Sequence, residues 1–258
     1  MALNIISNKN NNKKSEKPLI IAGPCTVENF EVMDKSAKLL SELGVEYIRG
    51  GAFKPRTSPY SFQGLGRDGL DILKEIKEKY SLKIVSEIMD ARDVEYALDI
   101  VDVIQIGSRN MYNYSLLKEV GKVNNTILLK RGISATLDEW LNAAEYIALE
   151  GNEDIIMCER GIRTFETYTR NTLDLSCIPA IQEKTGLKVI IDPSHGTGVR
   201  NMIAPMSRAS IAAGADGLII EMHPNPSEAV CDGEQSVDLE QFAKIYSEVT
   251  KLYNFVQD

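Results

Sequence analysis

The sequence predicts an α/β protein, a (β/α)8 TIM barrel that forms a single domain with a short polar N-terminal tail. Eight short apolar runs alternate with longer stretches of helical periodicity, and successive runs start 20 to 36 residues apart. This spacing is close to the ~30 residues of one strand–helix–strand unit. The length of 258 residues suits a barrel, which typically needs about 250. We expect the tail at residues 1–18 and the barrel at 19–258.

The predicted strands are apolar and rich in β-branched residues, as in parallel strands that are covered on both faces. They are Leu19–Ala22, Tyr47–Arg49, Lys83–Glu87, Val103–Ile106, Thr126–Lys130, Asp154–Cys158, Lys188–Ile191 and Gly217–Glu221. A doubly wound parallel sheet is the alternative architecture. Eight consecutive units with no linker between them favour the closed barrel.

Three stretches between or after these runs carry clear helix signals. Asn29–Leu43 begins with a capping residue and is followed by a glycine, which is typical of a helix end. In Ala135–Glu150, Thr136 and Glu139 have the spacing of a capping box. Val237–Phe255 places its large apolar residues on one face.

The charge balance excludes some classes of partner. The chain has 29 basic and 37 acidic residues, a formal net charge of −8, whereas nucleic acids and anionic membranes attract basic surfaces. No apolar run approaches the ~18 residues of a membrane span. The tail is too polar for a secretory signal, and four cysteines do not suggest a disulfide framework. We expect a cytoplasmic protein with a frayed tail and neither nucleic acid nor membrane as a partner.

Positive charge gathers where the predicted strands end, which is where the active residues of such barrels lie. Seven basic residues are found there: Arg49, Lys54, Arg56, Arg109, Lys130, Arg131 and Arg160. Three acids at the same rim, Glu87, Glu159 and Asp192, can pair with only some of them. Because Arg and Lys recognise phosphate and carboxylate groups, the pattern predicts strongly anionic substrates. Two phosphorylated compounds, or one plus a carboxylate, would satisfy it.

A second group at the same rim has the chemistry of a metal site. Its members are Cys25, His195, Glu221 and Asp232. The first and last strands of a closed barrel are neighbours, so these residues can meet although they are distant in sequence. Mixed sulfur, nitrogen and oxygen ligands favour a divalent transition metal over Mg²⁺ or Ca²⁺. The alternative for Cys25 is a small buried residue. His223 follows the same strand end as Glu221, and we expect it to support the site or the fold without binding the metal.

Several of these segments together resemble a known family. They are Gly23–Cys25, Arg49–Pro59, Ile106–Arg109, Lys130–Gly132, Asp192–Gly198 and Glu221–Pro224. They are similar to 3-deoxy-D-arabino-heptulosonate 7-phosphate (DAHP) synthases of the type I beta branch, and the resemblance spans roughly residues 19–250. It implies condensation of phosphoenolpyruvate with erythrose 4-phosphate, with release of phosphate, as the first step of the shikimate pathway. It also implies a homo-oligomer, either a dimer or a tetramer.

The resemblance implies a role for each matching residue. Cys25, His195, Glu221 and Asp232 would hold one divalent ion of the Mn, Fe, Co or Zn type. Arg49, Arg109, Lys130 and Arg160 would bind phosphoenolpyruvate, and Arg56 and Thr57 would bind the phosphate of erythrose 4-phosphate. Glu87 would support the same pocket. Lys54 would lie between the two substrates. From that position we expect it to relay a proton, and the predicted catalytic residues are Lys54, Cys25 and His195.

Three other functions are alternatives to this interpretation. The related 3-deoxy-D-manno-octulosonate 8-phosphate synthases typically have Ala-Asn-Arg where this chain has the segment Lys54–Ser58, and some replace the metal-binding cysteine by Asn. Both differences favour the four-carbon sugar. A Schiff-base aldolase with Lys130 as nucleophile would leave the Cys/His/Glu/Asp group unexplained. A non-catalytic sensor of phosphorylated metabolites would not need both groups.

Overall fold

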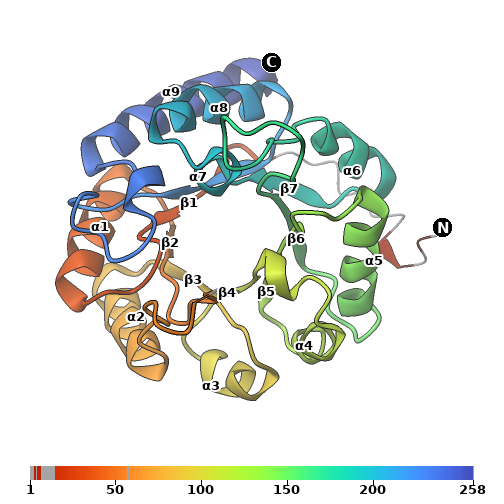
Figure 1. Ribbon diagram of the computed structural model, residues 1–258, viewed down its shortest axis with the longest axis horizontal. Helices are drawn as coiled ribbons and strands as arrows, with labels where there is room; N and C mark the ends of the chain where they lie inside the picture. The colour runs from red at the N-terminus through yellow and green to blue at the C-terminus, as the bar shows by residue number, and fades with distance from the viewer. Residues whose placement is uncertain (1–2, 4, 7–14, 57, 258) are drawn as a thin grey trace.

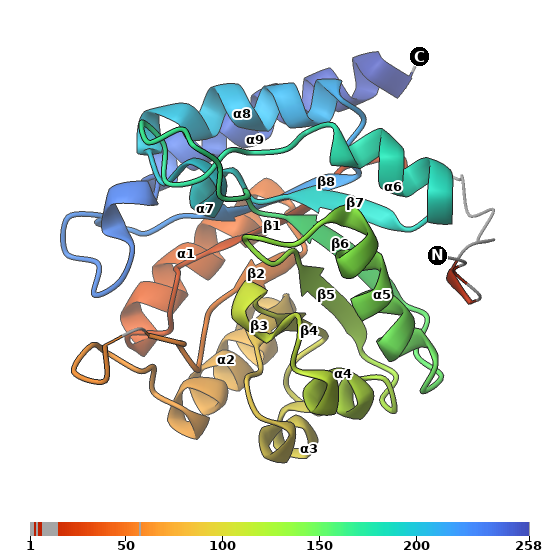
Figure 2. The same ribbon diagram turned by 45° about the vertical axis from the view of Figure 1, so that its right-hand side comes forward.

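The computed structural model describes residues 3, 5–6, 15–56 and 58–257. Eight parallel strands close into a barrel in chain order, and β1 pairs with β8. The helices form a ring around the strands (Figure 1), and Figure 2 shows the barrel obliquely. The predicted (β/α)8 barrel is therefore confirmed, and the doubly wound alternative is wrong because the sheet has no open edge.

The strands follow the predicted runs closely. They are β1 (Leu19–Gly23), β2 (Tyr47–Arg49), β3 (Lys83–Glu87), β4 (Val103–Ile106), β5 (Thr126–Lys130), β6 (Ile155–Glu159), β7 (Lys188–Ile191) and β8 (Gly217–Glu221). Only β1 and β6 differ from the predicted bounds, β1 by one residue at its end and β6 by one residue at both ends.

The helices occupy the stretches between the strands and the segment after β8. They are α1 (Phe30–Leu43), α2 (Arg67–Tyr80), α3 (Val94–Ala97), α4 (Tyr114–Val120), α5 (Leu137–Ala148), α6 (Cys177–Thr185), α7 (Pro193–Thr197), α8 (Arg200–Ala212) and α9 (Leu239–Gln257). Short 3-10 helices are η2 (Ala91–Asp93), η3 (Ser108–Asn110) and η4 (Gly233–Gln235). In the described part of the chain, no helix is both long and apolar enough to cross a membrane.

The predicted helix ends are present. The side chain of Asn29 accepts a hydrogen bond from the backbone of Val32, and Gly44 closes α1 with a φ of 72°. Thr136 and Glu139 form both hydrogen bonds of the capping box at the start of α5. These local interactions satisfy backbone groups that the helix itself leaves without partners.

Two apolar layers hold the barrel together. A small cluster inside the barrel contains buried residues of every strand but β2, for example Ile21, Leu128 and Ile219, and Tyr47 of β2 packs against it. A larger cluster between strands and helices includes Trp140 and Phe242, both fully buried. Strands covered on both faces need apolar residues in both directions, which explains the uninterrupted apolar runs in the sequence.

The inner apolar layer also determines which charged side chains point into the barrel. Side chains of a strand alternate between its two faces, so the residue two positions after an inner core residue again points inward. Ile219 is followed in this way by Glu221, Leu128 by Lys130, and Val85 by Glu87. The carboxyl end of the barrel therefore carries an inward-facing layer of charged side chains directly above the apolar one.

Part of the predicted N-terminal tail packs against the barrel. Ile6 is fully buried, and the backbone amides of Ile5 and Ile6 donate to the carboxylate of Glu145 on α5. Leu3 and Ile5 also contact the core. These apolar residues cover surface beside α5, so this piece of the segment is not frayed as expected.

Candidate active site

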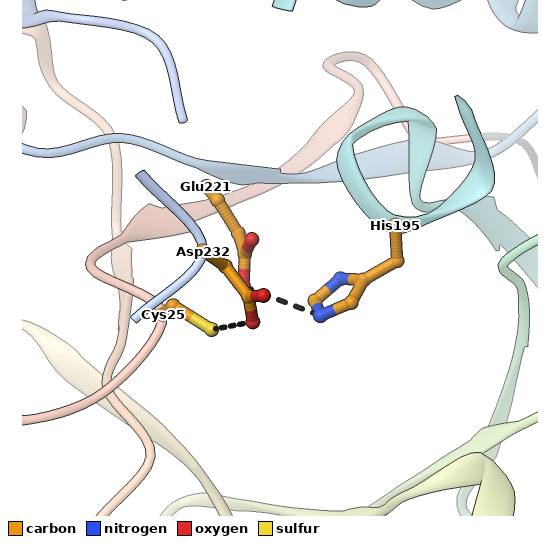
Figure 3. Close-up of side chains that lie close together, drawn as sticks. All are labelled: Cys25, His195, Glu221 and Asp232. Carbon is orange, nitrogen blue, oxygen red and sulfur yellow. Dashed lines mark hydrogen bonds and ion pairs between the residues drawn. The ribbon is translucent and has the colours of Figure 1, made fainter. Parts of the chain in front are cut away.

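Four side chains converge at the carboxyl end of the barrel. Cys25 follows β1, His195 lies in α7, Glu221 ends β8, and Asp232 precedes η4. Their potential ligand atoms all lie within 4.8 Å of one another, and Figure 3 shows the four side chains pointing toward a common centre. Sulfur, nitrogen and two oxygen donors in this arrangement fit a single divalent transition-metal ion. The side chains predicted to share an ion are thus brought together.

His195 is held in place by Asp192. One carboxylate oxygen of Asp192 accepts from the backbone N–H of His195 at 2.9 Å, and the other lies 2.8 Å from the ring Nδ1. Asp192 is the N-cap of α7 and Pro193 follows at the first helical position, a sequence that favours a helix start. A proton on Nδ1 leaves Nε2, which lies 3.3 Å from Glu221 Oε1, free to bind a metal.

Glu221 is fully buried and surrounded by donors. Its Oε1 accepts from Arg49 NH1 at 2.9 Å, and its Oε2 accepts from Gln235 Nε2 at 2.6 Å. Burial acts to raise the pKa of Glu221, but His195, Arg49 and Lys54 outweigh it and lower the pKa. The carboxylate is therefore ionised, the form that binds a cation.

Cys25 and Asp232 contact each other and Lys54. Cys25 Sγ is 3.0 Å from Asp232 Oδ2, and Lys54 Nζ lies 2.6 Å from Cys25 Sγ and 3.2 Å from Asp232 Oδ2. Burial raises the pKa of the Cys25 thiol, whereas a bound metal ion would lower it. Burial lowers the pKa of His195 to about 4, so its imidazole is neutral and able to act as a ligand near neutral pH.

A cavity of about 280 Å³ opens beside this group, and His195 belongs to both. Its basic lining residues are Arg49, Lys54, Arg109, Lys130, Arg160, Arg163 and Arg170. Glu87 also lines the cavity. Arg160 is 6% exposed, and burial lowers the pKa of its guanidinium. A bound anion would offset that cost, so the cavity is suited to multiply charged anions.

Comparison with known proteins identifies the family. The sequence profile described as "DAHP synthetase I family" matches residues 5–256. The chain belongs to the DAHP synthetase I family. A phospho-2-dehydro-3-deoxyheptonate aldolase of Thermotoga maritima is 52% identical over 233 residues, which cover 90% of this chain and 69% of that protein.

Solved structures and more distant relatives agree with this membership. The crystal structure of the Thermotoga maritima DAHP synthase matches with a TM-score of 0.89 and 51% identity, covering 92% of this chain and 69% of that one. A truncated form from the same organism matches with a TM-score of 0.85 and 46% identity, covering 92% and 87%. A 2-dehydro-3-deoxyphosphooctonate aldolase of Syntrophotalea carbinolica is 33% identical over 89% of this chain and 88% of its own length.

Most of the residues that the DAHP synthase resemblance implicated lie around the cavity or the four-residue group. Arg49, Lys54, Glu87, Arg109, Lys130 and Arg160 line the cavity. Arg56 is half-buried, and its NH1 donates to Cys231 Sγ at 2.8 Å, next to Asp232. Thr57 lies outside the described residues.

Arg131 is an exception among the seven basic residues expected at the rim. It is 4% exposed, and its NH1 lies 3.0 Å from Glu159 and 2.8 Å from Asp174. Because Lys130 points into the barrel, alternation turns Arg131 outward, toward the helices. The expectation that Arg131 joins the anion pocket is therefore wrong, and it has a structural role in this DAHP synthase family member.

Sequence reasoning missed several residues of the site. Arg163, Arg170 and Asn171 line the cavity from the β6–α6 loop, and reading that loop beyond Gly161 would have found the two arginines. Gln235 contacts Glu221, but a neutral residue in a loop gives no signal of this kind.

A larger cavity, of about 380 Å³, opens at the opposite end of the barrel, where the strands begin. Leu19, Tyr47, Lys188 and Tyr253 are among its lining residues. It lies away from the group that could bind a metal, so size alone does not locate the active site of this DAHP synthase family member.

Proposed function

We propose that the protein condenses phosphoenolpyruvate with erythrose 4-phosphate to give DAHP and phosphate, using one divalent metal ion. The observation that carries the proposal is the position of His195, which belongs both to the four-residue ligand group and to the cationic cavity. The cavity would hold two anionic substrates beside the metal. The 52% identity to the Thermotoga maritima aldolase supports the same reaction.

We assign binding of phosphoenolpyruvate to Arg49, Arg109, Lys130 and Arg160. Their charges would neutralise a phosphate and a carboxylate, and holding two mutually repelling anions in one orientation lowers the barrier to reaction. Lys130 is fixed by its ion pair with Asp192, and Arg49 by Glu221. Both cations are therefore already oriented before substrate enters. Arg56 and Thr57 are assigned to the phosphate of erythrose 4-phosphate, and Glu87 to a supporting role.

Cys25, His195, Glu221 and Asp232 would hold the metal ion, of the Mn, Fe, Co or Zn type. A divalent ion there would supply Lewis acidity for an aldehyde oxygen. Lys54 lies beside Cys25 and Asp232 and lines the cavity. Burial acts to lower the pKa of Lys54, but Cys25 and Glu221 raise it above the ordinary value. Its ammonium is therefore protonated near neutral pH. Because a raised pKa makes it a weak acid, it could donate only to a strong base, such as an oxygen on which negative charge develops.

The test is release of phosphate from phosphoenolpyruvate with erythrose 4-phosphate or arabinose 5-phosphate as co-substrate. We expect a higher kcat/KM with the four-carbon sugar, loss of activity with a chelator, and recovery after addition of a divalent transition metal. A higher kcat/KM with the five-carbon sugar would instead support the 2-dehydro-3-deoxyphosphooctonate aldolase activity of relatives such as the 33% identical Syntrophotalea carbinolica protein.

The same phosphate-release assay, run after treatment with borohydride, distinguishes a Schiff-base aldolase. That mechanism needs a neutral lysine amine, whereas Lys130 is buried in an ion pair with Asp192. Borohydride in the presence of substrate would inactivate a Schiff-base enzyme irreversibly. We expect it to have no effect here.

We further propose that the protein acts in the cytoplasm as a homodimer or homotetramer, with no nucleic acid or membrane as partner. The net charge of −8 supports the absence of nucleic acid and membrane partners, since both bind basic surfaces. Light scattering of the purified protein would give its mass in solution, and a monomer at micromolar concentration would contradict the expected assembly.

A further inference from the structure

Gln235 lies at the end of η4, three residues after Asp232, and its side chain reaches back to Glu221. Its Nε2 donates to Glu221 Oε2 at 2.6 Å. The other oxygen of the same carboxylate, Oε1, faces His195 and Arg49. Gln235 is 4% exposed and Glu221 is fully buried. One oxygen of the Glu221 carboxylate therefore faces the proposed metal position, and the other accepts a hydrogen bond from Gln235.

The amide of Gln235 is oriented from its other side by Arg170. Arg170 NH1 donates to Gln235 Oε1 at 3.0 Å. A guanidinium can only donate hydrogen bonds and a carboxylate can only accept them, so the amide must give its oxygen to Arg170 and its nitrogen to Glu221. Rotating the amide by 180° would break both interactions.

Both ends of this chain of contacts are tied to the fold. The backbone N–H of Arg170 donates to Thr197 O at 2.8 Å, in the helix that carries His195. Arg200 NH2 donates to Gly233 O at 2.6 Å and so anchors η4. The three side chains thus connect the β6–α6 loop, η4 and the end of β8.

We propose that Gln235 is a positioning residue for the metal ligand Glu221, and that Arg170 maintains the orientation of Gln235. The inference rests on the proposed metal site. Partners of a ligating carboxylate restrict its rotation, and their loss typically weakens metal affinity 10- to 100-fold. Arg170 is exposed and acts on Glu221 only through Gln235. Its loss should therefore weaken metal affinity less than the loss of Gln235.

The test is titration of the metal-free protein with Co²⁺, followed by the charge-transfer absorption of the Cys25 thiolate–cobalt bond. This absorption measurement does not depend on catalytic activity. Gln235→Met keeps the length of the side chain but removes the donor and acceptor, and we expect Co²⁺ to bind at least about 10-fold more weakly. Arg170→Met should give a loss of a few-fold, and Arg170→Lys, which keeps a donor, should recover most of it. The double variant should bind no more weakly than Gln235→Met alone.

Arg208→Met is the matched control for the loss of an arginine. Arg208 is an arginine on α8 whose half-exposed side chain pairs with Glu248 and does not line the cavity, so its loss should leave the Co²⁺ affinity unchanged. Circular dichroism and thermal melting of the metal-free proteins would verify folding. If Gln235→Met does not fold, the comparison of Arg170→Met with Arg170→Lys decides the question.

The possible failures are distinguishable. Wild-type Co²⁺ affinity in a folded Gln235→Met variant would overturn the role of Gln235. Equal affinities of Arg170→Met and the wild type, or additive losses in the double variant, would overturn the role of Arg170. If the wild type shows no thiolate–cobalt absorption, the metal site itself is wrong, and the role of Gln235 is overturned with it.

Discussion

Asp192 Oδ2 lies 2.5 Å from Lys130 Nζ, in an ion pair that is buried at the top of the barrel. The same oxygen lies 2.8 Å from His195 Nδ1. Asp192 therefore fixes one side chain assigned to phosphoenolpyruvate and one assigned to the metal. The two halves of the proposed site share a single carboxylate.

Asp192→Asn should damage both halves. Lys130 would lose its counter-charge inside the barrel, which typically destabilises a protein by about 3–5 kcal/mol, and His195 would lose a partner that orients it, which typically weakens metal affinity 10- to 100-fold. Urea denaturation and metal titration would measure these effects. Asp138→Asn is the control, because Asp138 forms an exposed pair with Lys184 and should change the free energy of unfolding by less than about 1 kcal/mol. A normal metal affinity in Asp192→Asn would contradict this account.

Arg131 and Arg160 should respond oppositely to replacement by Met. Arg131→Met removes the cation that pairs with the buried carboxylate of Glu159 and the neighbouring one of Asp174. We therefore expect a loss of stability of about 3–5 kcal/mol with little change in the KM for phosphoenolpyruvate. Arg160→Met removes a cation from the cavity and should raise that KM at least about tenfold with little loss of stability. Denaturation and steady-state kinetics of both variants test the distinction, which fails if the two variants behave alike.

Lys54→Met should reduce turnover more than it reduces binding. If Lys54 donates a proton during the reaction, kcat should fall by about 10²- to 10⁴-fold, while the KM for phosphoenolpyruvate changes little. Lys83→Met, at the beginning of β3 and far from the site, serves as the control and should retain normal kinetics. Near-normal kcat in Lys54→Met would exclude the proton-transfer role.

Glu87→Gln should change the pH dependence of stability. Burial raises the pKa of Glu87 above 4.5, although Lys54, Lys130, Arg49 and Arg109 act to lower it. At low pH the carboxyl is protonated in both the folded and unfolded chain, so burial has no ionisation cost. As the pH rises through the raised pKa, the folded state must ionise a buried group and loses stability.

The neutral amide that Glu87→Gln introduces removes this cost. The Tm of the metal-free variant, relative to the wild type, should therefore increase as the pH is raised from about 4 to about 7. Calorimetry across this range measures the difference. Glu46→Gln, at an exposed position near the start of β2, should show no such trend. A relative Tm that falls with rising pH would contradict the prediction.

The sequence by itself predicted the barrel and most of the residues that converge at the candidate site. Each strand that is covered on both faces must be apolar, so the eight runs were visible and six of them have the predicted bounds. Because the carboxyl ends of parallel strands meet at one rim, Cys25, His195, Glu221 and Asp232 could be grouped although 207 residues separate the first from the last.

Only the tertiary structure decided which charges face each other. The difference between Lys130 and Arg131 depends on a single step of strand alternation, and the partner of Arg131, Asp174, lies in a loop whose path the sequence does not specify. Gln235 reaches Glu221 for the same reason. The local sequence determines the hydrophobic periodicity of each strand and helix. The contacts of a loop side chain depend instead on how the loops pack together in space.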